Sequence, residues 1–193
     1  MVAGAMLQGF QAPTHKFSTE DKTRLISLNQ EFLAISDKKY IRWNDFRHEL
    51  HQIEEAFRET YGPPFYQRLG LRYRNIVDRN QLQLKSESWA ALLNQSLIGS
   101  LGSADLANDI TETRNQTLIK LPNGSNDFIR LVHGLPKGAT NLYVIDVDIF
   151  SEERREITHA FESLDHFNTS AFKLFRWCIT NRLRDVLEPT PSE

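Results

Sequence analysis

Two segments in which apolar and charged side chains alternate constrain the fold of this chain most strongly. Alternate residues of a β-strand face opposite sides of the sheet. In residues 65–77 one face would carry Leu69, Leu71, Tyr73 and Val77, and the other Arg68, Gly70, Arg72, Arg74 and Ile76. In residues 141–150 the two faces would carry Tyr143, Ile145, Val147 and Ile149 on one side, and Leu142, Val144, Asp146, Asp148 and Phe150 on the other. Both segments therefore predict strands with one face toward a core and the other toward solvent.

The charged face of these strands admits three explanations. Arg130, in the predicted strand 127–133, falls on the same face as Phe128 and Val132. The first explanation is structural: Arg68, Arg72 and Arg74 pair with Asp146 and Asp148, and each cross-strand pair contributes about 0.2–1 kcal/mol. The second is a binding groove for an anionic ligand or an acidic partner surface, since the guanidinium group holds carboxylate or phosphate with two hydrogen bonds. The third is acid–base catalysis by the two aspartates.

The rest of the chain alternates between strand and helix patterns. Residues 25–28 and 32–35 predict a hairpin, and apolar residues at steps of three and four over 40–61 predict an amphipathic helix. A second helix follows from Trp89 to Leu97, then strands at 117–121, 127–133 and 141–150, whose short linkers predict an antiparallel meander. Residues 155–187 are helical, and Asn168-Thr169-Ser170 either caps a second helix or kinks a single long one.

This order predicts an α+β fold in which an antiparallel sheet of about five to seven strands has helices 40–61 and 155–187 packed on one face. By analogy, a long C-terminal helix across a curved sheet would be a helix-grip-like arrangement. We expect a leader or peripheral segment over 1–19, a single domain over 20–188 and a frayed tail over 189–193.

Composition narrows the classes of function. The formal net charge of the 193-residue chain is −2, whereas proteins that bind nucleic acid usually carry a basic excess. Cys178 is the only cysteine, so the chain can form neither an intrachain disulfide nor a four-cysteine zinc site, which favours a cytoplasmic location. No apolar run approaches the ~18 residues that a membrane span needs.

Other motifs point to no chemistry. In "HELH" at 48–51 the histidines stand three residues apart, whereas the zincin helix needs four, so His48 and His51 are expected on a solvent-facing helix surface. His159, Glu162 and His166 are expected to be exposed in the same way, and Cys178 to be a buried, inert thiol. No phosphate-loop pattern occurs, and we expect neither a metal nor another cofactor.

The strand Arg68-Leu69-Gly70-Leu71-Arg72-Tyr73-Arg74-Asn75 resembles the signature of a sporadically distributed, uncharacterised family of prokaryotic proteins with an RLGLRY-x-N strand. The likeness covers roughly residues 20–187 and includes Tyr40, Trp43 and Phe46 upstream and Asp146, Asp148 and the C-terminal helix downstream. Members are usually longer at the N-terminus, so the resemblance implies a reduced initial strand region here. It implies no activity, but patchy occurrence suggests an accessory role, such as in a defence or toxin–antitoxin system.

The sequence therefore favours a non-catalytic binding or assembly module that engages a partner protein through the sheet face or a sheet edge. Arg68, Arg72, Arg74, Arg130, Asp146 and Asp148 are the predicted binding residues. A small-ligand pocket between the sheet and the C-terminal helix is the alternative, and nucleic-acid binding through the arginine row is a further one that the net charge disfavours. The sequence also leaves open that the protein binds a small anionic ligand and that it forms a homo-oligomer. We expect no association with a membrane.

Overall fold

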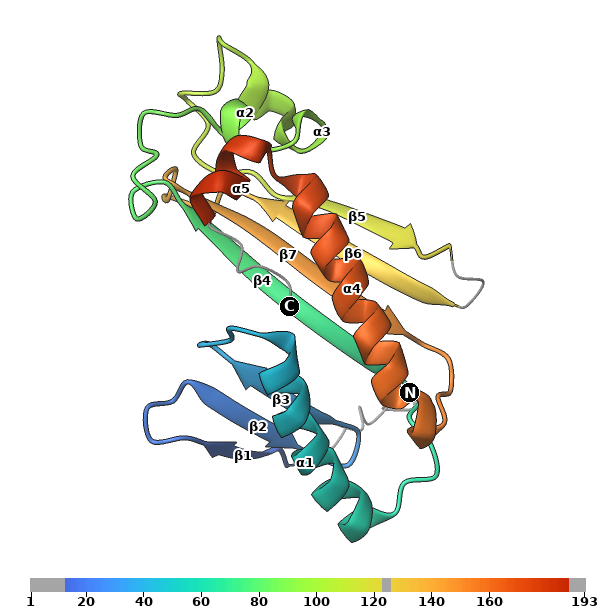
Figure 1. Ribbon diagram of the computed structural model, residues 1–193. Coiled ribbons are helices and arrows are strands. Elements are labelled where there is room, and N and C mark those ends of the chain that lie inside the picture. The colour runs from blue at the N-terminus through green and yellow to red at the C-terminus, as the bar shows by residue number, and fades with distance from the viewer. Residues whose placement is uncertain (1–12, 123–125, 188–193) are drawn as a thin grey trace, which may run out of the picture. The chain divides into compact units, whose positions relative to one another are not determined.

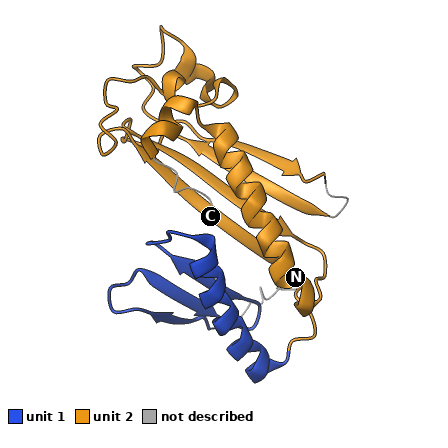
Figure 2. Ribbon diagram, in the orientation of Figure 1, with its two compact units in different colours: residues 1–62 blue, residues 63–193 orange. Residues whose placement is uncertain are grey.

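The chain divides into two compact units, residues 1–62 and 63–193 (Figure 2). The computed structural model describes residues 13–122 and 126–187. These residues form two antiparallel sheets, of three and four strands, and the helices include a long one near the C-terminus. The predicted α+β class is confirmed. The strand patterns suggested one sheet, but the strands before and after residue 62 pair only among themselves within the described residues.

Unit 1 is a three-stranded meander followed by one helix. The strands are β1 (His15–Ser18), β2 (Arg24–Leu28) and β3 (Leu33–Asp37), and the helix is α1 (Trp43–Tyr61). The predicted hairpin is confirmed, because β2 and β3 pair antiparallel. The helix ends as predicted at Gly62, whose φ of 54° is the left-handed conformation that glycine adopts at little cost.

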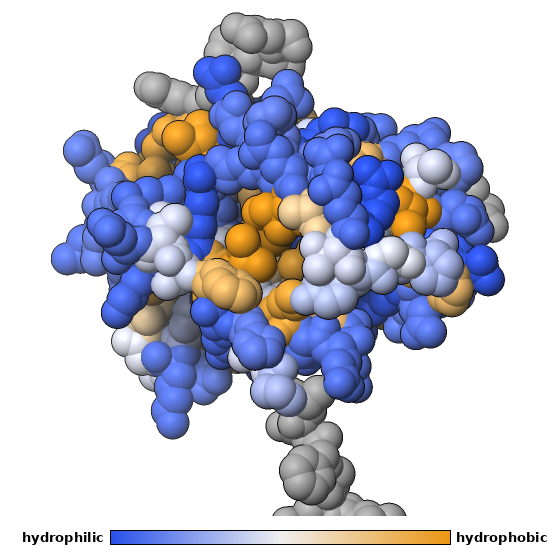
Figure 3. All heavy atoms as spheres, turned by 90° about the horizontal axis from the view of Figure 1, so that it is seen from below, coloured by the Kyte–Doolittle hydropathy of each residue, from blue (hydrophilic) through white to orange (hydrophobic). Residues whose placement is uncertain are grey.

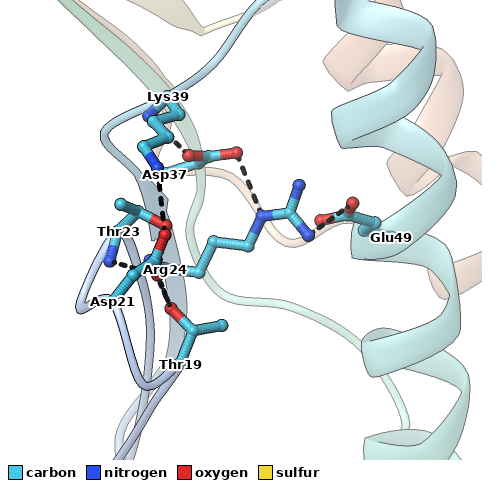
Figure 4. Close-up of polar contacts among 7 residues, drawn as sticks. All are labelled: Thr19, Asp21, Thr23, Arg24, Asp37, Lys39 and Glu49. Carbon is cyan, nitrogen blue, oxygen red and sulfur yellow. Dashed lines mark hydrogen bonds and ion pairs between the residues drawn. The ribbon is translucent and has the colours of Figure 1, made fainter.

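A polar cluster ties the sheet of unit 1 to its helix (Figure 4). Arg24 on β2 lies between two carboxylates, with Nε 3.2 Å from Asp37 Oδ2 on β3 and Nη1 2.8 Å from Glu49 Oε1 on α1. In the turn before β2, Asp21 accepts hydrogen bonds from the Thr19 and Thr23 hydroxyls at 2.7 and 2.8 Å. These hydrogen bonds lower the pKa of Asp21, because they favour the charged form of its carboxyl group.

Unit 1 buries little apolar surface. Among residues 13–62 only Glu54, at 9% exposure, is buried. The large apolar side chains that stay exposed are Phe17, Phe32, Tyr40, Ile41 and Tyr61. On the face of the whole molecule that Figure 3 draws, hydrophobic residues lie among hydrophilic ones. Because a small unit with one helix covers little of its sheet, the core of the chain lies in unit 2.

Unit 2 is built on the four-stranded sheet. The strand order is β4-β7-β6-β5, with β4 at Leu69–Asp78, β7 at Leu142–Ser151, β6 at Asp127–Gly134 and β5 at Asn115–Lys120. The last three strands form the predicted meander, and β4 adds to it beside β7. Helix α4 (Ala160–Cys178) lies lengthwise along one face (Figure 1), as expected of the C-terminal helix.

The parity derived from the sequence is confirmed on the face under α4. The fully buried side chains include Tyr143, Ile145, Val147 and Ile149 of β7 and Phe167 of α4. Tyr73 of β4 also points this way, and its hydroxyl donates a 2.9 Å hydrogen bond to Asn168 Oδ1 of α4. A continuous apolar strip on the central strand therefore fixes which face the helix covers.

The helix predicted from Trp89 to Leu97 is wrong, because that segment breaks into single turns. Helix α2 (Trp89–Leu92) ends where Leu93 becomes extended and forms a β-bridge with Ile179. Helix α3 (Gln95–Ile98) begins after Asn94, whose side-chain oxygen accepts from the Ser96 N–H at 2.9 Å, and the 3₁₀ turn η1 (Gly99–Gly102) follows. Pairing with a distant segment thus overrides the local helical pattern.

The C-terminal helical region breaks later than predicted. Asn168-Thr169-Ser170 neither caps nor kinks a helix, because α4 runs through these residues to Cys178. The chain becomes extended at Ile179, and α5 (Asn181–Leu187) follows. The break allows the Thr180 hydroxyl to donate a 2.7 Å hydrogen bond to the Ala91 carbonyl of α2.

The remaining predictions from sequence concern two turns and the two ends of the chain. The turn at Pro136-Lys137-Gly138 is confirmed, since the Ala139 N–H donates to the Pro136 carbonyl at 3.1 Å. In the other predicted turn, Asn123 and Gly124 lie outside the described residues, as do residues 1–12 of the predicted leader and the tail 189–193. The described end of the predicted leader forms β1, an edge strand of unit 1.

Candidate binding face

The face of the unit 2 sheet opposite α4 carries most of the charged residues singled out by sequence. We call it the candidate binding face. By strand register its residues are Arg68, Gly70, Arg72, Arg74, Ile76 and Asp78 from β4 and its flank, Leu142, Val144, Asp146, Asp148 and Phe150 from β7, Phe128, Arg130, Val132 and Gly134 from β6, and Arg114, Gln116, Leu118 and Lys120 from β5 and its flank. Four strands thus bring together all six of the binding residues predicted from sequence.

Arg72 and Asp146 form the best-defined ion pair of this face. Arg72 donates from Nε to Asp146 Oδ1 at 2.8 Å and from Nη2 to Oδ2 at 2.5 Å. This two-bond geometry confirms the predicted pairing, and it raises the pKa of the Arg72 guanidinium. The strand register places Arg72 directly opposite Asp148, so its side chain reaches diagonally to the next carboxylate.

Asp148 is shared by two other arginines. Its Oδ2 lies 3.3 Å from Arg130 Nη1 and 3.6 Å from Arg68 Nη2. The guanidinium carbons of Arg68 and Arg130 also lie 4.8 and 4.9 Å from the centre of the Phe150 ring. Phe150 is only 3% exposed although it belongs to the face opposite α4. The two arginines therefore cover an apolar ring as well as a carboxylate.

Gly70 permits this arrangement. The register of β4 with β7 continues through Gly70, so the bulge that a glycine in a strand can indicate is absent. A Cβ at this position would lie 3.2 Å from Arg68 Nη1. The glycine therefore allows Arg68 to lie across its own strand toward Asp148 and Phe150.

Three basic residues of the face remain without an acidic partner among the described residues. The face carries six basic side chains, Arg68, Arg72, Arg74, Arg114, Lys120 and Arg130, and three carboxylates, Asp78, Asp146 and Asp148. Asp78 accepts from the Asn80 N–H and Asn141 Nδ2 at the end of β4. No ion pair within residues 13–122 and 126–187 engages Arg74, Arg114 or Lys120, so the predicted pairing of Arg74 is wrong.

A hollow of about 160 Å³ lies in the middle of the face. It is lined by Arg72, Arg114, Gln116, Arg130, Val132, Asp146 and Asp148. Sequence reasoning missed Arg114 and Gln116, because it began the strand at Thr117. The alternation of Arg114, Gln116, Leu118 and Lys120 was the available signal.

The other groups singled out by sequence are two sets of exposed side chains and one buried cysteine. His48 and His51 are exposed on α1, as are His159, Glu162 and His166 around the start and middle of α4. Within the described ranges, no three His, Cys, Asp or Glu side chains lie close enough together to hold a metal ion. Cys178 is completely buried, as predicted, and burial raises the pKa of its thiol to about 12, which makes it a poor nucleophile.

A buried polar pair, His133 and Tyr143, supports the sheet under α4. His133 Nδ1 and the Tyr143 hydroxyl lie 2.7 Å apart, and the hydroxyl is 3.4 Å from the Leu97 carbonyl oxygen. Burial lowers the pKa of His133 and raises that of Tyr143, so both side chains are neutral at neutral pH. The pair is enclosed in the core and serves packing.

The chain matches no protein-family model, no curated protein and no solved structure. The resemblance to the family with the RLGLRY-x-N strand therefore stays a prediction. Among the described helices, none is both long enough and apolar enough to cross a membrane.

Proposed function

We propose that this protein is a non-catalytic binding module that holds an acidic surface of a partner protein on the candidate binding face. The observation that carries the proposal is a set of cations, Arg74, Arg114 and Lys120, that have no acidic partner within residues 13–122 and 126–187 and lie on a sheet face that α4 leaves open. The hollow beside Arg114 has room for a carboxylate side chain between guanidinium groups. We further propose a cytoplasmic, accessory role, in line with the resemblance implied by the strand signature.

The composition of the face supports binding over catalysis. Among its described residues there is no Ser, Thr, Cys or His, so the candidates for a nucleophile or general base are the aspartates and Lys120. Asp146 and Asp148 are both engaged by arginines. Carboxylates that are already held by guanidinium groups are poorly placed to act as an acid–base pair, which supports binding over catalysis.

The alternatives from sequence have less support. The interface between the sheet and α4 is filled by fully buried Tyr143, Ile145, Ile149 and Phe167, which favours a packed core over a ligand pocket. Proteins that bind single-stranded nucleic acid stack bases on exposed aromatic rings, whereas Phe150 lies beneath two guanidinium groups. An acidic protein surface needs no aromatic platform.

The proposal can be tested with poly-L-glutamate as a model acidic polypeptide. Arg74→Glu should weaken its binding by roughly fivefold, the factor that corresponds to about 1 kcal/mol. Lys85→Glu makes the same charge change on an exposed residue after β4 and off the face, so it should leave the affinity unchanged. Equal effects of the two variants, or tight, salt-sensitive binding of duplex DNA with none of polyglutamate, would contradict the proposal.

A further inference from the structure

Strand β5 is an edge strand whose outer side is unpaired within the described part of the chain. It pairs with β6 on one side, and no other strand among the described residues pairs with it. In contrast to the central strands, β5 is exposed on both faces: Thr117, on the side of α4, is exposed, and so is Leu118 on the candidate binding face. The helix therefore does not cover this edge.

The hydrogen-bond pattern shows which residues offer their backbone to a new strand. Thr113 N–H donates to the Leu135 carbonyl at 3.1 Å, and Leu121 N–H to the Asp127 carbonyl at 2.9 Å. In an antiparallel pair only every second residue bonds to the neighbour. The odd-numbered residues of β5 thus bond to β6, and the N–H and C=O groups of Gln116, Leu118 and Lys120 point away from the sheet.

The same residues present a defined pattern of side chains. Leu118 is 57% exposed. It lies between Gln116 and Lys120 on the candidate binding face, and Arg114 follows one step beyond Gln116. Arg114 and Lys120 have no acidic partner among the described residues. The edge thus alternates a cation, an apolar residue, an amide and a cation along its length.

We propose that the partner adds an extended, acidic segment to β5 as a fifth strand of the sheet. In an antiparallel addition, side chains on the candidate binding face lie opposite Lys120, Leu118, Gln116 and Arg114 in turn. Charge complementarity then specifies acidic, apolar, polar and acidic residues at alternate positions of the segment. Backbone hydrogen bonds supply affinity, and the alternate side chains supply specificity. This inference rests on the proposed function, since it identifies the kind of partner that the face binds.

The test uses the full chain and two synthetic peptides of identical composition. The first, Glu-Thr-Val-Thr-Gln-Thr-Glu, places both acids on the candidate binding face. The second, Thr-Glu-Val-Thr-Gln-Glu-Thr, places them on the opposite face of the added strand. The first should bind at least tenfold more tightly by calorimetry. On binding it should protect the amides of Gln116, Leu118 and Lys120 from hydrogen exchange. Equal affinities, or no protection of these amides, would overturn the inference.

A proline substitution separates edge pairing from charge attraction. Leu118→Pro removes an outward N–H but no bond to β6, so the sheet should remain folded by circular dichroism. Leu118→Pro should lower the affinity for the first peptide at least tenfold. Leu118→Ala keeps the N–H and should lower this affinity only a fewfold. Polyglutamate binding should respond to Arg74→Glu whether or not the peptide binds, so the two proposals can fail separately. If Leu118→Pro instead dissociates a dimer in sedimentation, the edge pairs with a second copy and the inference is wrong.

Discussion

Replacing Asp146 with asparagine should lower the stability of unit 2 and, at the same time, strengthen its binding of acidic ligands. Asparagine keeps the shape of the side chain but removes the charge that holds Arg72. The side chain of Asp146 is 11% exposed and that of Arg72 is 64% exposed. Because water reaches the guanidinium, the pair should be worth about 1 kcal/mol, the upper end for exposed pairs, and not the larger cost of breaking a buried pair.

The assay is urea unfolding followed by tryptophan fluorescence in a Trp43→Phe background, so that the signal comes from unit 2. Asp146→Asn should lower the free energy of unfolding by about 1 kcal/mol, or Tm by roughly 2–4 °C for a chain of this size. Combined with Arg72→Gln in a double-mutant cycle, it should show a coupling energy of about 1 kcal/mol.

The same substitution should strengthen the binding of polyglutamate although it weakens the fold, and this contrast makes the test decisive. Removing one of the carboxylates of the candidate binding face leaves its basic excess larger, so polyglutamate should bind roughly two- to threefold more tightly. Weaker binding by Asp146→Asn would show that the carboxylate itself contacts the ligand. That result, or a coupling energy below about 0.3 kcal/mol, would refute the account of Asp146 as a structural partner of Arg72.

Three further predictions concern the core of unit 2. Because burial lowers the pKa of His133, the unfolded chain binds more protons than the folded chain below pH 6.5. The free energy of unfolding should therefore fall on acidification by up to about 1.4 kcal/mol per pH unit, and the slope should be smaller in His133→Gln. Equal slopes of the wild-type chain and His133→Gln from pH 5 to 8 would contradict this. Gly134→Ala should lower the free energy of unfolding in urea by about 3 kcal/mol, because φ is 151° and a Cβ would overlap the Thr113 carbonyl oxygen. Gly138→Ala has open space around the new Cβ and should cost about 1 kcal/mol. Similar losses in the two variants would refute the steric argument. Cys178 should react with a thiol reagent at pH 8 only in denaturant, and rapid labelling of the native protein would show that it is accessible.

Strand parity made much of the candidate binding face predictable. The alternation in residues 65–77 and 141–150 placed Arg72 and Asp146 on one face and Tyr143 on the other, because a strand that is buried on one side has only one register that hides its apolar residues. The same argument held for Arg130 on β6. The amphipathic pattern of α1 and its glycine stop were equally clear.

Side-chain pairing and strand neighbours were not predictable in this way. Arg74 lies directly opposite Asp146 in the register, yet Arg72 holds that carboxylate, since a long side chain can reach diagonally as well as straight across. Local helical pattern likewise failed at Leu93, where a bridge to Ile179 interrupts the helix. Both outcomes depend on residues far away in the chain.

The sequence by itself determined the class of fold, the two faces of each central strand and the residues that form the charged row, because side-chain periodicity follows from backbone geometry alone. Only the tertiary structure decided that the strands form two sheets, that β5 brings Arg114 beside Arg130 and Arg72, and that its outer edge is open. These features arise from contacts between distant segments, whose choice of partner is set by the packing of the whole chain and has no local signature.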